Sequence, residues 1–341
     1  MDRSRGCAPR VAFQGEPGAF SEDAALVYFG GAAETVPCRD FAGVGAAVAR
    51  GDVAYGVLPV ENTLAGSVVG VYDVLLREPL EIVGEVVRPI RHCLLGVPGA
   101  RVEGVRRILS HPVALAQCTR YLASHPAEAV AVYDTAGAAK EVAAAGDATQ
   151  AAVAGRIAAE RYGLIVLADG IEDRPDNQTR FYVVERAQGA AGPGPDRRPG
   201  PERPRRSDDR PGGGAPACTG ARPGAAQRAG PGEPAAAGAA TPAMPAPGAA
   251  RYRTVLVLET EDRPGALVAV LAPFAEHGIN LAKLESRPAD DPWRYRFFLE
   301  LAADAAAPAA ARAIDEVRAR TVTLRVLGSF PCDAVAGAEV A

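Results

Sequence analysis

The N-terminal half of the chain alternates short apolar runs with segments in which apolar residues recur every three or four positions. The first pattern is typical of buried strands and the second of amphipathic helices. Strands that alternate with helices favour a parallel or mixed sheet covered on both faces. The pattern predicts strands at residues 10–13, 55–60, 80–88, 91–97, 104–109, 129–133, 164–167 and 181–184, with helices beginning near residues 21, 40, 68, 110 and 134.

Two of the expected helices have recognisable ends. Ser21 can cap the helix that follows the glycine-containing turn at 14–18, and Glu22 and Asp23 are favourably placed in its first turn. Residues 151–162, rich in alanine, are predicted as a single helix that Gly163 ends.

The composition changes abruptly after the last of these strands. Between about residues 187 and 250 there is no Val, Ile, Leu or aromatic residue, and Pro and Gly make up about two-fifths of the segment. Such a stretch cannot bury enough apolar surface to offset its ordering entropy, so we expect a disordered tether. Two globular regions remain, at about 10–186 and 251–332.

The second globular region has a different order of elements. Strands are predicted at 254–258, 279–287, 293–301 and 322–327, with helices at 262–277 and 306–320. The order βαββαβ is the ferredoxin-like arrangement.

Composition and charge exclude several classes of protein. The 341 residues carry a net charge of −4 with mixed signs, which gives no case for a nucleic-acid partner. Six scattered cysteines without metal-ligand spacing indicate reduced thiols and neither a metal nor a cofactor. The N-terminus lacks an apolar secretion segment, and no later run is long enough to span a bilayer. We therefore expect a cytoplasmic protein without a membrane partner.

Polar side chains gather where predicted strands end, near residues 61, 110 and 134. Asn62, Thr63 and Ser67 offer an amide and two hydroxyls after the strand at 55–60, which is where open α/β sheets bind ligands. Taken alone, Ser67 is better explained as a helix cap. His111 lies at the second of these turns, and a single histidine beside a proline is more often a capping or packing residue than a catalyst.

A polar, turn-rich segment at 169–180 leads into the strand that begins at Phe181. Asn177, Thr179 and Arg180 present an amide, a hydroxyl and a guanidinium that can bind a carboxylate through both oxygens. An equally good explanation is that Asn177 and Thr179 only satisfy the turn backbone. A site of amides, hydroxyls and one arginine suits an anionic small molecule whose reaction needs positioning and charge stabilisation.

At these positions the sequence resembles the prephenate dehydratases. Five motifs occur in the family's order and cover the first globular region: FQGEPGAFSE at 13–22, PVENTLAGSV at 59–68, SHPVALAQC at 110–118, DTAGAA at 134–139 and NQTRF at 177–181. The resemblance implies conversion of prephenate to phenylpyruvate, water and carbon dioxide. It also implies a fold like a type 2 periplasmic binding protein, with one α/β lobe at about 10–88 and 166–186 and the other at 89–165.

The resemblance also implies roles for individual residues. The family's catalytic threonine falls on Thr179 and its neighbouring arginine on Arg180, and we expect Thr179 to donate a proton or strong hydrogen bond to the departing hydroxyl. The expected catalytic residues are Thr179, Arg180, Asn62 and Thr63, and the expected substrate-binding residues are Glu61, Ser67, Gln117, Thr135, Asn177 and Phe181. Two positions depart from the family pattern: Thr63 replaces the usual serine, and Val113 replaces a common glutamine.

The second globular region resembles an ACT domain. The implied effector is L-phenylalanine, acting as a feedback inhibitor, and paired ACT domains imply a homodimer or homotetramer. The residues that match the family's phenylalanine-binding signature are Gly265, Ala266, Leu267, Glu285, Ser286, Arg287 and Pro288. The long tether departs from the family, so coupling between the two regions has to pass through docked surfaces.

Two other interpretations stay open. One is a related enzyme, an arogenate dehydratase or a prephenate decarboxylase, although the intact Thr179-Arg180-Phe181 argues against decarboxylation alone. The other is an amino-acid sensor without catalytic activity, against which the retained Asn62 and Thr179 argue.

Overall fold

The computed structural model describes residues 8–188, 251–289, 291 and 293–332. Nearly all of the expected tether at 187–250 lies outside these ranges, as do Cys7 and Cys218. In the described part of the chain the four cysteines are free thiols. No helix within the described ranges is long and apolar enough to cross a membrane.

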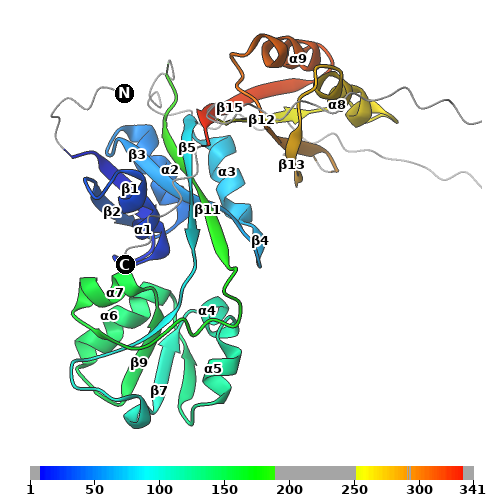
Figure 1. Cartoon of the computed structure of the whole chain (residues 1–341). Helices are drawn as coiled ribbons and strands as arrows, with labels where there is room; N and C mark the ends of the chain where they lie inside the picture. Colours follow the sequence, from blue (N-terminus) through cyan, green and yellow to red (C-terminus); the bar gives the residue numbers. More distant parts are fainter. Residues whose placement is uncertain (1–7, 189–250, 290, 292, 333–341) are drawn as a thin grey trace, which may run out of the picture. The chain divides into compact units, whose positions relative to one another are not determined.

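The first lobe is built on a mixed sheet with the strand order β2-β1-β3-β11-β5, to which the short β4 adds by pairing with β3 (Figure 1). Strands β1, β2 and β3 are parallel, whereas β11 runs antiparallel to both β3 and β5. The elements are β1 (Arg10–Gln14), α1 (Phe20–Tyr28), β2 (Glu34–Cys38), α2 (Phe41–Arg50), β3 (Tyr55–Asn62), β4 (Gly66–Ser67), α3 (Val69–Arg77), β5 (Leu80–Pro89) and β11 (Gln178–Arg186).

The two faces of this sheet are covered differently. Helix α1 packs on one face, against buried residues that include Val11, Val57 and Phe181. Helices α2 and α3 pack on the opposite face, in a cluster that also contains Tyr182. Because successive side chains of a strand point to opposite faces, neighbouring residues of β11 contribute to different cores.

The second lobe has a sheet of its own, in the order β10-β6-β9-β7-β8. Its core consists mainly of small residues of β9 and α6, such as Ala152 and Ala139. The elements are β6 (Cys93–Gly96), a 3-10 turn (Val102–Gly104), β7 (Arg107–Ser110), α4 (Pro112–Ala116), α5 (Thr119–Ala123), β8 (Glu128–Ala131), α6 (Thr135–Ala145), β9 (Gln150–Ala154), α7 (Arg156–Tyr162) and β10 (Ile165–Asp169).

Two of three local expectations were wrong. Residues 150–154 form the central strand β9 and only Arg156–Tyr162 is helical, because a short buried run of alanines fits a strand as well as a helix. Ala19, not Ser21, occupies the N-cap of α1, where Glu22 Oε2 accepts a hydrogen bond from Gly18 N at 2.6 Å. His111 does cap α4, as expected, by accepting from Val113 N.

The chain crosses between the lobes twice, once after β5 and once before β11. Strand β10 pairs with β6, so residues 166–169 belong to the second sheet, and not to the first lobe as the sequence suggested. Contacts join the lobes at the turn before α1: Arg161 Nη2 lies 2.6 Å from Glu22 Oε1, and Tyr162 donates to Pro17 O at 2.7 Å. These contacts bring the ends of β1 and β3 close to the second lobe.

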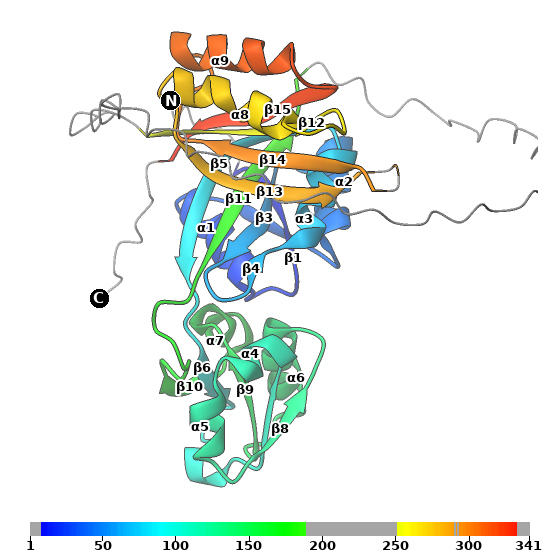
Figure 2. The ribbon, with the colours of Figure 1, turned by 90° about the vertical axis from the view of Figure 1, so that its right-hand side faces the viewer.

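The C-terminal domain, residues 251–332, forms an antiparallel sheet in the order β13-β14-β12-β15. Its elements are β12 (Tyr252–Glu259), α8 (Ala266–Glu276), β13 (Leu281–Pro288), β14 (Tyr295–Leu301), α9 (Pro308–Arg318) and β15 (Thr323–Pro331). Helices α8 and α9 lie side by side on one face of the sheet (Figures 1 and 2). The predicted ferredoxin-like βαββαβ order is confirmed.

The free face of the C-terminal sheet packs on the first lobe. Phe298 and Phe330 join the same hydrophobic cluster as Tyr72 and Tyr182, with ring centroids 4.7 Å apart for Tyr72 and Phe298. A side chain at Gly328 would come within 2.1 Å of the Ile82 carbonyl oxygen, so only glycine fits there. The docked surfaces expected from the sequence are therefore present.

Candidate active site

The centre of the candidate site is a hydrogen-bonded pair on neighbouring strands. Thr179 of β11 and Asn62 of β3 are register partners, and Asn62 Nδ2 lies 2.9 Å from Thr179 Oγ1. The threonine is 8% exposed. Since its oxygen accepts from the amide, its proton is available to donate to a ligand.

Asn62 and Thr63 also hold the surrounding loop. Asn62 Oδ1 accepts from the backbone N–H groups of Leu64 and Ala65, at 2.9 and 2.8 Å. Thr63 Oγ1 accepts from Gln178 N at 3.0 Å. These bonds tie the loop after β3 to the start of β11, so Thr63 acts on Thr179 through the backbone, and Asn62 acts both through the backbone and directly.

A cavity of about 400 Å³ lies beside this pair, between the first and second lobes. Asn177 is 1% exposed, accepts from Asn62 Nδ2 at 2.8 Å, and has an amide nitrogen without a partner among the described residues. A buried donor left unpaired is costly unless a ligand or water fills the gap. The cavity is lined by Leu64, Ala65, Val113, Ala116, Gln117, Glu172, Asp173, Arg174 and Asn177.

Glu172, in the lining of this cavity, and His92, buried behind the lining residue Gln117, are two residues that the sequence analysis missed. His92 is 2% exposed, and its Nε2 lies 3.0 Å from Gln117 Oε1. Burial lowers the pKa of His92, which outweighs the opposing effects of Gln117 and Glu172 and keeps the ring neutral near pH 7. Glu172 accepts from His92 N at 2.9 Å and from Arg91 Nη1 at 2.8 Å. Neither residue stands in a recognisable motif.

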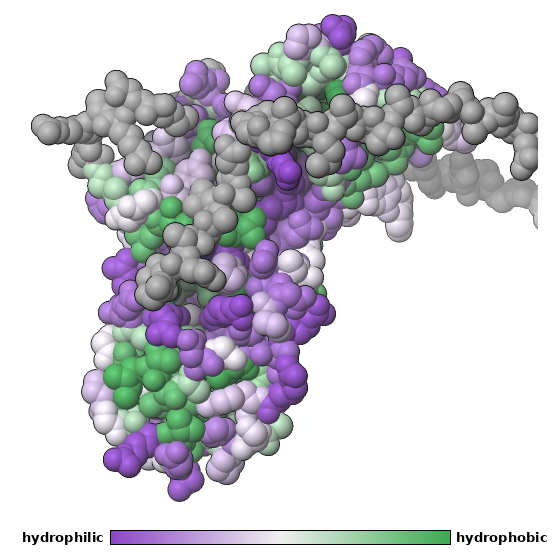
Figure 3. Space-filling view, viewed as in Figure 1, coloured by the Kyte–Doolittle hydropathy of each residue, from purple (hydrophilic) through white to green (hydrophobic). Residues whose placement is uncertain are grey.

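A second cavity, of about 370 Å³, lies at the carboxyl ends of β1 and β2 and is also lined by Tyr133 and Asp134 of the second lobe. Lys140 Nζ donates to Glu16 Oε2 at 2.9 Å across it. Partial desolvation of the hydroxyl, followed by the charge of Glu16, raises the pKa of Tyr133, although the residue as a whole is 63% exposed. Thr135 begins α6 beside this cavity. On the face drawn in Figure 3, hydrophilic side chains predominate where the two lobes adjoin.

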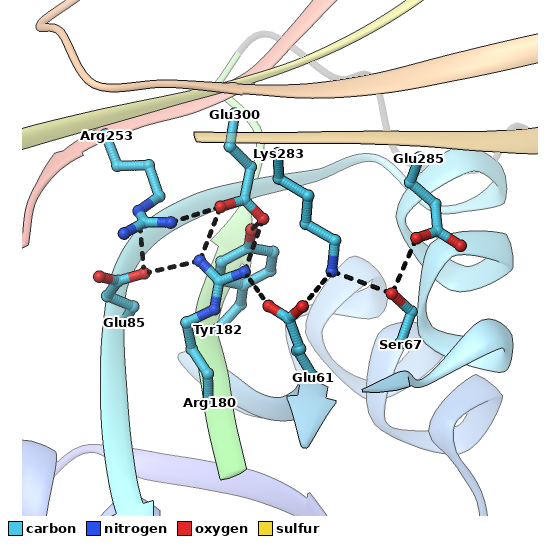
Figure 4. Close-up of polar contacts among 9 residues, drawn as sticks. All are labelled: Glu61, Ser67, Glu85, Arg180, Tyr182, Arg253, Lys283, Glu285 and Glu300. Atoms are coloured by element: carbon cyan, nitrogen blue, oxygen red, sulfur yellow. Dashed lines mark hydrogen bonds and ion pairs between the residues drawn. The ribbon is translucent and has the colours of Figure 1, made fainter. Parts of the chain in front are cut away.

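Arg180 does not lie on the cavity side of the sheet. Its guanidinium donates to Glu61 Oε2 at 2.7 Å and to both oxygens of Glu300 of the C-terminal domain, at 2.7 and 2.8 Å (Figure 4). Its side chain is 12% exposed. The expectation that Arg180 holds a substrate carboxylate conflicts with this geometry, because three carboxylates, including that of Glu85, already surround the guanidinium.

Glu61 and Ser67 lie on the same side as Arg180. Lys283 of the C-terminal domain pairs with Glu61 Oε1 at 3.1 Å and donates to Ser67 Oγ at 2.9 Å. Ser67 in turn donates to Glu285 Oε2 at 2.8 Å. Ser67 is thus part of β4, not the cap of α3, and the expected contact of Glu61 and Ser67 with substrate conflicts with these positions.

Two arginines stand closer to the Thr179 side. Arg88 is the register partner of Thr179 on β5, and its Nε donates to Asp23 of α1 at 2.7 Å. Because α1 covers the face opposite to the C-terminal domain, this contact places Arg88 on the face of Thr179. Arg91 follows on the crossing to the second lobe. Phe181 is 1% exposed and packs in the hydrophobic core under α1, so its side chain is a core residue.

The expected effector residues occupy two separate elements. Gly265, with a φ of 81°, caps α8, and Ala266 and Leu267 begin that helix. Residues 285–288 end β13, where Arg287 Nε is buried without a partner among the described residues. Within the described ranges no group of three or more His, Cys, Asp or Glu side chains could hold a metal ion.

Two α/β lobes with a cavity between them and a ferredoxin-like domain docked behind define a class of small-molecule-binding protein with an attached second domain. Residues 11–189 match the family model for prephenate dehydratase, and residues 254–319 match the model for the ACT domain. The chain belongs to the prephenate dehydratase family, whose members are lyases.

Curated relatives and a solved structure carry the same family name, whereas another similar structure is described by a different activity. Arogenate dehydratase/prephenate dehydratase 1 of Arabidopsis thaliana, described as chloroplastic, is 35% identical over 96% of this chain and 73% of its own length. The prephenate dehydratase of Arthrobacter aurescens, solved in complex with L-phenylalanine, is 27% identical with a TM-score of 0.70, covering 94% of this chain and 89% of that one. A structure described as GqqA, a novel type of quorum quenching acylase, is 32% identical with a TM-score of 0.72, covering 95% and 98%.

Proposed function

We propose that this protein converts prephenate to phenylpyruvate, water and carbon dioxide in L-phenylalanine biosynthesis, with Thr179 as the catalytic residue. The observation that carries the proposal is the Thr179 hydroxyl, which accepts from Asn62 and keeps its proton for a ligand beside a cavity with an unpaired amide donor.

The reaction requires little more than orientation and charge stabilisation. As the ring carboxylate leaves as carbon dioxide, its electron pair enters the ring, and the hydroxyl leaves with its bonding electrons to give an aromatic product. Thr179 stabilises the departing oxygen by a hydrogen bond, and Asn62 keeps Thr179 in place. Asn177 and Gln117 offer further polar groups in the same cavity.

The positive charge that holds the two carboxylates of prephenate does not come from Arg180, as the sequence suggested. Arg88 at the end of β5 and Arg91 on the crossing that follows take the place of Arg180, which is engaged behind the sheet. A guanidinium binds a carboxylate well even when one of its nitrogens is already paired, since five N–H groups are available.

Arogenate is the second candidate substrate. It carries an ammonium group where prephenate has a ketone, and the carboxylates of Glu172 and Asp173 line the cavity. The names of several curated relatives favour it too. An acylase activity is less well supported, because Thr179 is hydrogen-bonded to an amide, which cannot serve as the base that a nucleophilic threonine needs.

One assay separates these candidates. Purified full-length protein is incubated with prephenate or arogenate, and the product is identified. Phenylpyruvate from prephenate supports the proposal, phenylalanine from arogenate alone supports the second candidate, and a decarboxylated product that keeps its hydroxyl contradicts both. If neither compound is converted, the result favours an amino-acid sensor without catalytic activity. Incubation of the same preparation with an acylase substrate tests for acylase activity.

Regulation by L-phenylalanine is part of the proposal. The matched ACT domain and the L-phenylalanine complex of the Arthrobacter aurescens relative support it. We expect L-phenylalanine to lower turnover and to bind a homodimer or homotetramer through residues 265–267 and 285–288. Light scattering with and without L-phenylalanine measures the assembly. A cytoplasmic location stays a prediction.

A further inference from the structure

The charged side chains behind Asn62 and Thr179 belong to the same two strands as the catalytic pair. Glu61 and Arg180 are register partners, directly next to the partners Asn62 and Thr179. Since neighbouring residues of a strand face opposite ways, Asn62 and Thr179 face the side that α1 covers, where Asn62 bonds Asn177 of the cavity lining, and Glu61 and Arg180 face the C-terminal domain. Figure 4 shows this second side, with Glu61 and Arg180 reaching toward Lys283 and Glu300.

Glu300 holds Arg180 in one orientation. Its two carboxylate oxygens accept from the two terminal nitrogens of Arg180, a paired geometry that fixes direction as well as distance. Tyr182 donates to Glu300 at 2.6 Å and Arg253 pairs with it from β12. The glutamate is 3% exposed, so these contacts are shielded from solvent.

Lys283 holds the other strand. It pairs with Glu61 and donates to Ser67, and Glu61 and Ser67 are themselves register partners on β3 and β4. Ser67 then donates to Glu285, which lies in the segment matched to effector binding. An effector that contacts Glu285 would therefore act on the end of β3 through a single hydroxyl.

The charged cluster is balanced. It comprises three carboxylates and three cations: Glu61, Glu85, Glu300, Arg180, Arg253 and Lys283. Loss of one member leaves an uncompensated charge in a largely buried place, which favours movement of the strands that carry the others. Such movement would reach Asn62 and Thr179 within one residue.

We propose that Glu300 and Lys283 of the C-terminal domain are positioning residues for the dehydration, which hold the ends of β11 and β3 from behind so that Thr179 and Asn62 stay aligned in the cavity. The inference deepens the proposed function and rests on it for the reaction concerned. It gives the C-terminal domain a part in turnover even when no effector is bound.

The test compares full-length variants. Glu300→Gln and Lys283→Met should lower kcat by about 10- to 100-fold with KM within about twofold, because a small misplacement of the reacting group affects mainly the chemical step. Glu259→Gln is the matched control, since Glu259 pairs with Arg296 inside the C-terminal sheet at 2.5 Å. It should leave kcat unchanged. Glu300→Asp, which keeps the charge, should have a kcat between those of Glu300→Gln and wild type. It replaces Glu300→Gln in the comparison if Glu300→Gln folds poorly.

A second readout does not depend on turnover. Hydrogen exchange of a peptide covering 177–184 should speed up in Glu300→Gln and not in Glu259→Gln. Equal kcat and equal exchange in Glu300→Gln and wild type would overturn the positioning role. If wild-type protein turned over neither prephenate nor arogenate, the proposed function would fail, while the exchange comparison would still decide whether Glu300 holds β11.

Discussion

The two sides of the β3 and β11 strand ends differ in chemistry, although they are made by alternate residues of the same segments. The side that faces the cavity presents neutral groups, the amides of Asn62 and Asn177 and the hydroxyl of Thr179. The side that faces the C-terminal domain presents Glu61 and Arg180 to further buried charges.

This division suits a dianionic substrate. Neutral donors at the strand ends stabilise a departing oxygen without adding negative charge to a cavity that Glu172 and Asp173 already line. On the other side, charges that are neutralised pairwise give orientation to the docked domain. Thr179 and Arg180, neighbours in one motif, therefore have their partners on opposite faces of a single strand, so the role proposed for one need not hold for the other.

The largest expected effect comes from removing the hydroxyl on the cavity side. Thr179→Ala should lower kcat by roughly 1,000-fold while the free energy of unfolding changes by less than about 1 kcal/mol, because one partly shielded hydrogen bond is lost. Steady-state kinetics and chemical denaturation measure the two quantities. Thr179→Ser is the control and should keep most of the activity; a Thr179→Ala protein with near-normal kcat would remove Thr179 from the mechanism.

On the side that faces the C-terminal domain, removal of a charged side chain should lower mainly the stability of the fold. Arg180→Gln leaves Glu300, Glu85 and Glu61 without their shared cation, so we expect a decrease of about 3–5 kcal/mol in the free energy of unfolding. Urea denaturation measures it. The double variant Arg180→Gln with Glu300→Gln should regain part of the loss, and strict additivity of the two changes would contradict the direct pairing.

Low pH should weaken the contacts of Glu300 on this same side of the sheet. Burial alone raises the pKa of Glu300, but Arg180, Tyr182 and Arg253 outweigh it and hold the pKa at about 2, against an ordinary value of 4.5. A lowered pKa means that the ionised form stabilises the fold, so this contribution is complete above about pH 4.5 and is lost as pH falls toward 2. The loss is on the order of 3 kcal/mol.

The acid dependence has a direct control. Between pH 4.5 and 2, the free energy of unfolding of Glu300→Gln should fall less than that of wild type, because the contribution of Glu300 is already absent. Glu259→Gln should show the same decrease as wild type. The other charged groups of the cluster around Glu300 are Glu61, Glu85, Arg180, Arg253 and Lys283. Identical pH profiles for Glu300→Gln and wild type would show that Glu300 does not contribute.

The smallest effect is expected for an exposed ion pair, although its arginine, Arg174, is among the residues that line the cavity. Arg174 and Asp176 are 61% and 60% exposed in their side chains, although they lie close in sequence to Asn177. Arg174→Gln should change the free energy of unfolding by no more than about 0.5 kcal/mol, since exposed pairs are screened by water. A larger loss, measured by urea denaturation, would mean that this loop depends on more than the contacts described.

The sequence predicted the architecture better than the orientation of single side chains. Alternating apolar runs identified the sheets, and the order βαββαβ identified the C-terminal fold, because periodicity reports burial directly. The run at 151–154 failed because alanines alone carry no period that separates a strand from a helix.

The sequence also brought Asn62, Asn177 and Thr179 forward as one site, and the structure places them in contact; their catalytic roles stay a prediction. The sequence could not show that the Arg180 side chain points away from the cavity side of the sheet, since its partner Glu300 lies 120 residues further along the chain. Thr179 and Arg180 were expected in a loop, where alternation does not apply, yet both lie within β11. His92 and Glu172 had no local signal because only the tertiary fold brings them to the cavity.

The most direct test of the account is the binding of prephenate to the full-length Thr179→Ala variant by titration calorimetry. If Thr179 acts on the departing oxygen, as proposed, its loss removes an interaction made mainly in the transition state, so prephenate should bind within about threefold of its affinity for the Thr179→Ser control while turnover is lost. Binding that falls in parallel with turnover would contradict the account and make Thr179 a residue that merely holds the substrate.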